Sequence, residues 1–143
     1  MIINDKGRAL IMASESLRLE AYLCPAGIPT IGYGHTGDVK MGTKITVHQA
    51  EAILEYDLER FESAVSRLAP KANANQFSAC VSLAFNIGIA AFEKSTLLKE
   101  LNAGRFLNAA HQFDKWVHAK GKVLPGLVKR RAAEKALFLE VPS

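Results

Sequence analysis

The sequence predicts an α+β fold that is mostly helical, in which a small N-terminal β-meander is joined by a long helix to a helical C-terminal lobe. Three observations predict it. Apolar residues alternate with a period of two over residues 17–23, they recur at three- and four-residue steps over residues 47–68, and helical spacing then continues to the C-terminus. The 143 residues fit a single domain, 1–143, with lobes expected at about 15–45 and 70–143 and a connecting helix at about 47–69.

The chain begins with a predicted helix that Asn4 or Asp5 can cap and that extends to about Glu15. We expect its buried face to hold three apolar residues at helical spacing, namely Leu10, Ala13 and Leu17. The alternating pattern starts where this helix ends, so the chain changes from helix to strand close to Glu15.

Three short strands are expected after this helix. The first covers residues 17–23 and ends in a turn at 24–27, where proline fixes φ and glycine supplies a positive φ. The second covers residues 30–34, whose glycines suggest the close approach of another backbone or of a ligand. A third is expected over residues 39–41, after a turn at 36–38.

The longest helix signal begins at a capping box, in which Thr46 and Gln49 can satisfy each other's backbone N–H groups. Apolar residues then repeat with helical spacing until Pro70 ends the pattern. Further helices are expected over about 75–87, 95–104, 106–117 and 127–139.

The composition is that of an ordinary globular protein, with 49% hydrophobic and 22% charged residues. The formal net charge of +4 suits an anionic partner, but nucleic acid, an acidic membrane surface and the bacterial wall all qualify. The C-terminal basic cluster is expected to be a solvated face rather than a nucleic-acid reader, and it consists of Lys129, Arg130, Arg131 and Lys135. No apolar segment approaches the roughly 18 residues needed to span a bilayer, and no secretory signal is visible, so cytoplasmic accumulation is expected.

Glu15 is the candidate catalytic acid. Glycosidic bond cleavage needs a carboxylic acid that protonates the leaving oxygen, and a second group, usually a carboxylate, that positions water or stabilises the oxocarbenium-like state. Glu15 lies among short side chains where a helix runs into a strand, and the following turn brings Cys24 and Thr30 back toward the same edge. This position alone is not specific, because a single glutamate at a helix end is usually a solvated surface residue.

The segment over residues 14–36 resembles the catalytic segment of phage-type lysozymes, glycoside hydrolase family 24. The signature of that family is a Glu, eight residues, an Asp or Cys, five residues and a Thr. Glu15, Cys24 and Thr30 stand at those intervals. The resemblance continues in the same order through residues 85–88, 95–98, 101–104, 115–116 and 126–131.

The resemblance implies a lysozyme-like fold and an endolysin that hydrolyses the β-1,4 link between N-acetylmuramic acid and N-acetylglucosamine in bacterial peptidoglycan, for host cell lysis and phage release. Glu15 would be the general acid, and Thr30 would hydrogen-bond the attacking water or the sugar. Gly34 and His35 would line a cleft between the lobes. The other implied substrate-binding residues are Phe85, Asn86, Arg130 and Arg131. One of the two arginines would approach Glu15 or the peptide stem of the substrate.

Cys24 stands where a second carboxylate is usual. Only a few per cent of an ordinary thiol is thiolate at neutral pH, so Cys24 could be a thiolate base, a neutral group that positions water, or dispensable. Cys24 and Cys80 are too few for a disulfide framework, and Cys80 is expected to be a small buried hydrophobe. The four histidines show no metal-ligand spacing, so no metal and no cofactor is expected. Trp116 is expected in the core.

Two alternative functions remain open from sequence: lytic transglycosylase chemistry on the same bond, and a non-catalytic wall-binding helical module. A relative that kept the fold and lost activity is a third, for which Cys24 is the only hint. The expected partner is peptidoglycan rather than nucleic acid, and the chain is expected to be a monomer. The resemblance further implies that the protein waits in the host cytoplasm until a holin opens the inner membrane and releases it to the periplasm and cell wall.

Overall fold

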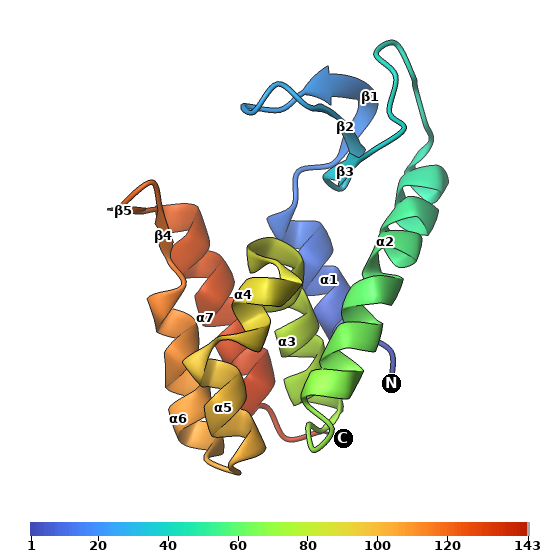
Figure 1. Cartoon of the computed structure of the whole chain (residues 1–143). Helices are drawn as coiled ribbons and strands as arrows, with labels where there is room; N and C mark the ends of the chain where they lie inside the picture. Colours follow the sequence, from blue (N-terminus) through green and yellow to red (C-terminus); the bar gives the residue numbers. More distant parts are fainter. Residues whose placement is uncertain (143) are drawn as a thin grey trace. The chain divides into compact units, whose positions relative to one another are not determined.

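The computed structural model describes residues 1–142 and is mostly helical with small antiparallel sheets, which confirms the predicted α+β class (Figure 1). The helices are α1 (Asp5–Ser14), α2 (Val47–Leu68), α3 (Ala74–Ile87), α4 (Ile89–Glu93), α5 (Thr96–Asn102), α6 (Phe106–Gln112) and α7 (Pro125–Leu139), with a 3-10 helix at Phe113–Lys115. The strands are β1 (Arg18–Leu23), β2 (Pro29–Gly32), β3 (His35–Thr36), β4 (His118–Ala119) and β5 (Lys122–Val123). The chain forms two compact units, one of residues 11–59 and one of residues 1–10 with 60–143. Within residues 1–142, no helix is both long and apolar enough to cross a membrane.

The unit of residues 11–59 contains an antiparallel sheet in the order β1-β2-β3. Residues 43–45 run along the other edge of β1, where the Ala21 N–H donates to the Thr43 carbonyl and the Ile45 N–H donates to the Leu19 carbonyl. The strand expected at residues 39–41 is wrong, because the third strand is β3. Gly37 and Asp38 have φ of 86° and 56°, so the chain leaves the extended conformation directly after β3.

Helix α2 begins at the predicted capping box. The Gln49 N–H donates to Thr46 Oγ1 at 3.1 Å, and the Thr46 N–H donates to Gln49 Oε1 at 2.8 Å. Its N-terminal half closes the core of this unit against the sheet, since a Cβ placed on Gly32 would lie 3.7 Å from the Cβ of Ala50. The buried apolar residues here are Ile11, Ala21, Ile31, Tyr33, Ala50, Leu54 and Leu58.

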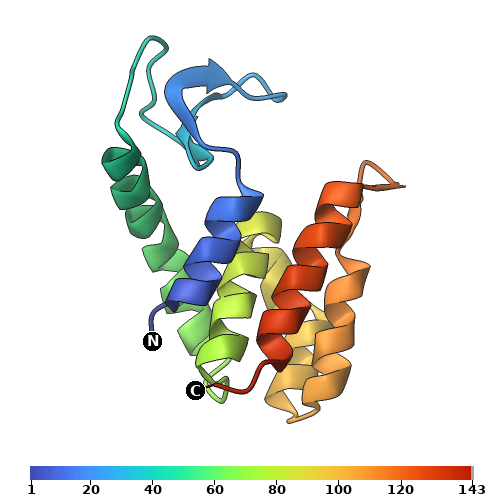
Figure 2. The ribbon, with the colours of Figure 1, turned by 180° about the vertical axis from the view of Figure 1, so that it is seen from behind.

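The larger unit is built around α3, which is buried at every position from Asn75 to Ala84 and therefore lies at the centre of its helices. Helices α1 and α7 lie on either side of it in Figure 2. The start of α1 contacts α3 directly, because the Asn4 N–H donates to Ser78 Oγ at 3.0 Å and a Cβ on Gly7 would come within 2.7 Å of the Ser78 Cβ.

The predicted buried face of α1 is wrong. The buried positions are Ile3, Gly7 and Ile11, whereas Leu10 is half-buried and Ala13 and Leu17 are exposed. Gly7 explains the shift, since a residue without a side chain gives no hydrophobic signal, yet it is the point where α3 approaches closely. The cap is as predicted, because Asn4 Oδ1 accepts from the Gly7 N–H at 2.9 Å.

The helix expected over residues 106–117 is too long. Helix α6 ends at Gln112, and after the 3-10 helix the chain forms the β4–β5 hairpin, which the sequence reading missed along with α4. Lys120 and Gly121 form the turn with φ of 52° and 77°. Two successive residues with positive φ are the backbone conformation of a tight hairpin turn.

Candidate active site

Glu15 directly follows α1, and its N–H donates to the Ile11 carbonyl at 2.8 Å, so the last turn of the helix fixes its backbone. Its side chain is half-buried. Gly34 lies between β2 and β3 with a φ of 81°, and a Cβ placed on it would lie 3.3 Å from Glu15 Oε1. The loop backbone therefore comes up against the carboxylate at a position where only glycine fits without displacing it.

Cys24 begins a tight turn that two backbone hydrogen bonds close. The Gly27 N–H donates to the Cys24 carbonyl at 2.8 Å, and the Cys24 N–H donates to the Ile28 carbonyl at 3.1 Å. This turn lowers the pKa of the Cys24 thiol, chiefly through the backbone N–H groups of Ile28 and Ala26, with smaller contributions from the Thr30 hydroxyl and the Gly27 N–H, while desolvation opposes the shift. Successive N–H groups directed at one atom favour its anionic form.

Thr30 is buried in β2 and completes this arrangement. Its hydroxyl donates to the Ile28 carbonyl at 2.9 Å and also contacts the Cys24 thiol. A hydroxyl has one proton and two lone pairs, so it can donate to only one of these acceptors at a time. Thr30 can thus donate to the sulfur when Cys24 is a thiolate and to the Ile28 carbonyl when Cys24 is a thiol, and in either case it can accept a hydrogen bond from water.

His35 is held by a carboxylate that the sequence reading missed. Its Nδ1 lies 2.7 Å from Asp57 Oδ2, and both side chains are half-buried. Asp57 is on α2, three residues after the buried Leu54, and so it lies at the edge of the buried face of that helix. The bond fixes the plane of the imidazole ring and leaves Nε2 available to a ligand.

Phe85 and Asn86, predicted to bind saccharide, lie in the last turn of α3. The half-buried Phe85 ring packs edge-on against Phe61 at a centroid distance of 5.2 Å. Asn86 is exposed, and its side-chain oxygen accepts a hydrogen bond from Arg131 Nη2.

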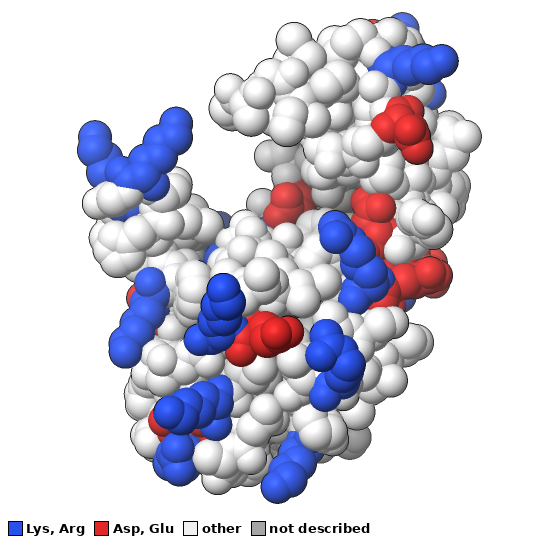
Figure 3. Space-filling model, in the orientation of Figure 1, with Lys and Arg blue, Asp and Glu red and all other residues white. Residues whose placement is uncertain are grey.

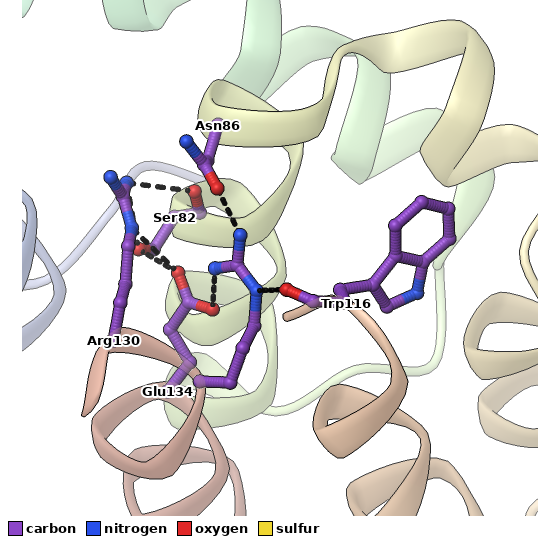
Figure 4. Close-up of polar contacts among 6 residues, drawn as sticks. Ser82, Asn86, Trp116, Arg130 and Glu134 are labelled. Atoms are coloured by element: carbon purple, nitrogen blue, oxygen red, sulfur yellow. Dashed lines mark hydrogen bonds and ion pairs between the residues drawn. The ribbon is translucent and has the colours of Figure 1, made fainter. Parts of the chain in front are cut away.

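Arg130 and Arg131 lie inside the larger unit, in a network with Glu134 (Figure 4). They are only 6% and 1% exposed, and Glu134 is fully buried. Arg131 Nη1 donates to Glu134 Oε1 at 2.6 Å and Arg130 Nε donates to Glu134 Oε2 at 3.2 Å, while Arg130 Nη2 donates to the Ser82 carbonyl at 3.2 Å. The sequence reading missed Glu134, although it follows Arg131 and Arg130 by three and four residues, the spacing at which helix side chains meet.

The expectation of a solvated basic face at residues 129–131 agrees with the exposed Lys129 and is wrong for Arg130 and Arg131. Arg130 and Arg131 are buried because one carboxylate inside the unit binds both, and Lys135 pairs with Asp114 at 2.8 Å. Exposed cationic groups occur instead on the β4–β5 hairpin, at Lys120 and Lys122. Figure 3 shows blue side chains gathered at the upper left, over the region of the hairpin.

Cys80 is fully buried in α3, as predicted for a small hydrophobic side chain. Burial raises the pKa of its thiol, and the nearby charge of Glu134 raises it further, so this cysteine stays neutral. Among residues 1–142, no three His, Cys, Asp or Glu side chains gather closely enough to hold a metal ion.

Residues 12–134 match the family model described as phage lysozyme. The chain belongs to the phage lysozyme family. It is 48% identical to the endolysin of Acyrthosiphon pisum secondary endosymbiont phage 1, over 96% of this chain and 98% of that protein. Among solved structures, it is similar to the muramidase domain of SpmX from Asticaccaulis excentricus, with a TM-score of 0.92 at 41% identity over 98% of this chain and 99% of that one. A P22 lysozyme mutant gives a TM-score of 0.90 at 41% identity, over 98% and 99% of the two chains. This phage lysozyme is accordingly a glycoside hydrolase.

Proposed function

We propose that this phage lysozyme is an N-acetylmuramidase that hydrolyses the β-1,4 link between N-acetylmuramic acid and N-acetylglucosamine in peptidoglycan, with Glu15 as general acid and Cys24 and Thr30 activating the water. The observation that carries the proposal is the Cys24 turn, whose N–H groups favour a thiolate in the same compact unit that fixes Glu15 against Gly34. The comparisons support the reaction, since the chain matches the phage lysozyme model, an endolysin and a muramidase domain.

In this mechanism the protonated Glu15 gives its proton to the glycosidic oxygen as the bond from that oxygen to the anomeric carbon breaks. The sugar gains oxocarbenium character, and a water molecule attacks its anomeric carbon. The Cys24 thiolate takes a proton from that water, so a new carbon–oxygen bond forms and a neutral thiol remains. Thr30 accepts a hydrogen bond from the water and so orients it. Exchange with solvent then returns the proton to Glu15 and removes the one on Cys24.

The substrate-binding residues form the second part of the proposal. Gly34 and His35 contact the sugars from the unit of residues 11–59, and the hydrogen bond to Asp57 keeps the His35 ring in place to donate or accept. Phe85 and Asn86 contribute an aromatic surface and an amide from the end of α3. Arg130 and Arg131 act on substrate binding indirectly. Their guanidinium groups are already bound to the Ser82 carbonyl and to Glu134 inside their unit.

The setting in the cell is a further part of the proposal. We expect a monomeric endolysin that waits in the host cytoplasm until a holin permits its release to the periplasm and cell wall. Co-expression with and without a holin tests this, with optical density as the measurement. Prompt lysis without the holin would contradict it, and it would indicate an export route of the protein's own.

Peptidoglycan digestion with product identification by mass spectrometry tests the reaction. Glu15→Gln should lower the rate by at least about 100-fold, the smallest contribution usual for a general acid. Cys24→Asp should keep activity, because a carboxylate also takes a proton from water, whereas Cys24→Ser should lose most of it. Circular dichroism of each variant checks that the fold is intact. Near-normal activity of Glu15→Gln would refute the assignment, and 1,6-anhydromuramic ends in place of reducing muramic ends would indicate a lytic transglycosylase.

A further inference from the structure

The amide of Asn86 is held by a guanidinium group that is itself held on its other sides. Arg131 Nη2 donates to Asn86 Oδ1, Arg131 Nε donates to the Trp116 carbonyl at 2.7 Å, and Nη1 donates to Glu134 at 2.6 Å. These partners come from α3, from the segment after α6 and from α7, so three parts of the unit fix the plane of one side chain (Figure 4). The Trp116 carbonyl and the buried Glu134 therefore hold the Arg131 guanidinium in addition to its bond to Asn86.

This bond determines which way the Asn86 amide faces. An asparagine side chain has one acceptor oxygen and one donor NH2 group, whereas a guanidinium has donors only. The oxygen must therefore face Arg131, and the NH2 group must face away from it. Figure 4 shows the amide nitrogen directed away from the network. Because Asn86 is exposed, its two N–H donors are presented at the surface in a fixed orientation.

The bond satisfies one N–H group of the buried Arg131, and it also holds an exposed amide in one orientation. An exposed amide is well solvated by water, and fixing its rotamer costs side-chain entropy. A fixed surface donor instead lowers the cost of binding, because the ligand does not have to order it. An exposed NH2 group held in this orientation fits a ligand that presents carbonyl oxygens.

We propose that Arg131 is a positioning residue for substrate binding, which turns the oxygen of Asn86 inward so that its NH2 group binds a carbonyl oxygen of the ligand, such as that of an N-acetylated sugar. The inference rests on the proposed muramidase function, which supplies acetamido groups, and it adds to that function a residue that does not touch the sugar. Arg131 is 1% exposed, so it acts through Asn86 and not by direct contact.

The test measures binding of the N-acetylglucosamine trimer by isothermal titration calorimetry, with every variant made in the Glu15→Gln protein so that turnover does not interfere. Asn86→Ala should weaken binding by about three- to tenfold, the value of one hydrogen bond. Asn86→Asp should weaken it by roughly tenfold or more, because a carboxylate still accepts from Arg131 but presents lone pairs to the ligand. Arg131→Lys should approach the affinity of Asn86→Ala, since an ammonium group does not reproduce the planar set of bonds.

The double variant Arg131→Lys with Asn86→Ala distinguishes positioning from a general structural role. If Arg131 acts through Asn86, the double variant binds no more weakly than Asn86→Ala alone. Leu137→Val in the core of α7 is the matched control, because it should lower the melting temperature and leave trimer affinity unchanged. If Arg131→Lys does not fold, the inference is tested by Asn86→Asp, which keeps an acceptor for Arg131 and removes the NH2 group. Wild-type affinity of this variant would then overturn the inference.

Two results would overturn the inference: wild-type affinity in Asn86→Asp, or an equal effect of Arg131→Lys with and without Asn86. If these occur while Glu15→Gln still abolishes peptidoglycan hydrolysis, the muramidase proposal stands and only the role of Arg131 fails. If Glu15→Gln remains active, the proposed function fails, and the trimer titration still reports whether the amide binds a carbonyl ligand.

Discussion

Gly34→Ala tests whether the loop backbone positions the carboxylate of Glu15, the proposed general acid. The new Cβ would lie 3.3 Å from Glu15 Oε1, which is tighter than most real Cβ contacts, so the carboxylate must move by a few tenths of an ångström. The backbone also has a φ of 81°. An alanine in this left-handed region costs about 1–2 kcal/mol. For a domain of this size, that free energy corresponds to a fall of roughly 2–8 °C in melting temperature.

The expected loss of activity is separate from the loss of stability. A displacement of 1 Å can cost about 100-fold, so a few tenths of an ångström should lower the rate of peptidoglycan hydrolysis by on the order of tenfold. Gly37→Ala is the matched control, because Gly37 has a φ of 86° and nothing lies within 4 Å of its Cβ position. It should lose similar stability and keep its activity at 25 °C. Equal activities of the two variants would refute the idea that Gly34 positions Glu15.

Three further predictions concern the groups around the site. Asp57→Asn should lower the free energy of unfolding by about 1–2 kcal/mol by calorimetry, because it weakens the 2.7 Å bond to His35, and an unchanged value would contradict this. Iodoacetamide should alkylate Cys24 in the folded protein and leave Cys80 intact, since the N–H groups of the turn lower the pKa of the first thiol and burial raises that of the second. The Cys24 rate should rise with pH around a midpoint below the roughly 8.5 of a free cysteine; a higher midpoint would argue against a thiolate base. Glu134→Gln should cost about 3–5 kcal/mol in urea unfolding, because it removes the charge that two guanidinium groups contact, and a cost below about 1 kcal/mol would show that the network adds little.

The parts of the fold that depend on neighbouring residues could be predicted from sequence. Helix α2 and its capping box follow from apolar spacing and from the Thr46–Gln49 pair, which are both local. The buried face of α1 could not be predicted, because it depends on the contact between Gly7 and Ser78, which are 71 positions apart. The β4–β5 hairpin was missed for a different reason. The expected helices end at about 117 and begin again at about 127, and strands of only two residues each, β4 and β5, are too short to show an alternating pattern between them.

The candidate site divides in the same way. Glu15, Cys24 and Thr30 are predicted as site residues through a motif of fixed spacing within one short segment. Asp57 and Glu134 were not found, because a carboxylate on an amphipathic helix looks like a solvated residue until its partner is known. The partner of Asp57 is 22 residues away, and Glu134 contacts Ser82 across 52 residues. Net charge did not indicate where the arginines lie, because a surface patch and a buried ion network contribute the same number of positive charges.

The Cys24 turn gives a physical reason why a thiol can take the place of a carboxylate in this family. A carboxylate is ionised at neutral pH without help, whereas an ordinary thiol is mostly protonated. The backbone N–H groups of Ala26, Gly27 and Ile28 supply the missing stabilisation of the anion, and the Thr30 hydroxyl adds a donor that can turn away when the sulfur is protonated. The donors are mostly backbone groups of a short turn, so they are present whichever residue occupies position 24. An aspartate there would be bound by the same N–H groups, and the turn is therefore compatible with both residues that the family signature allows.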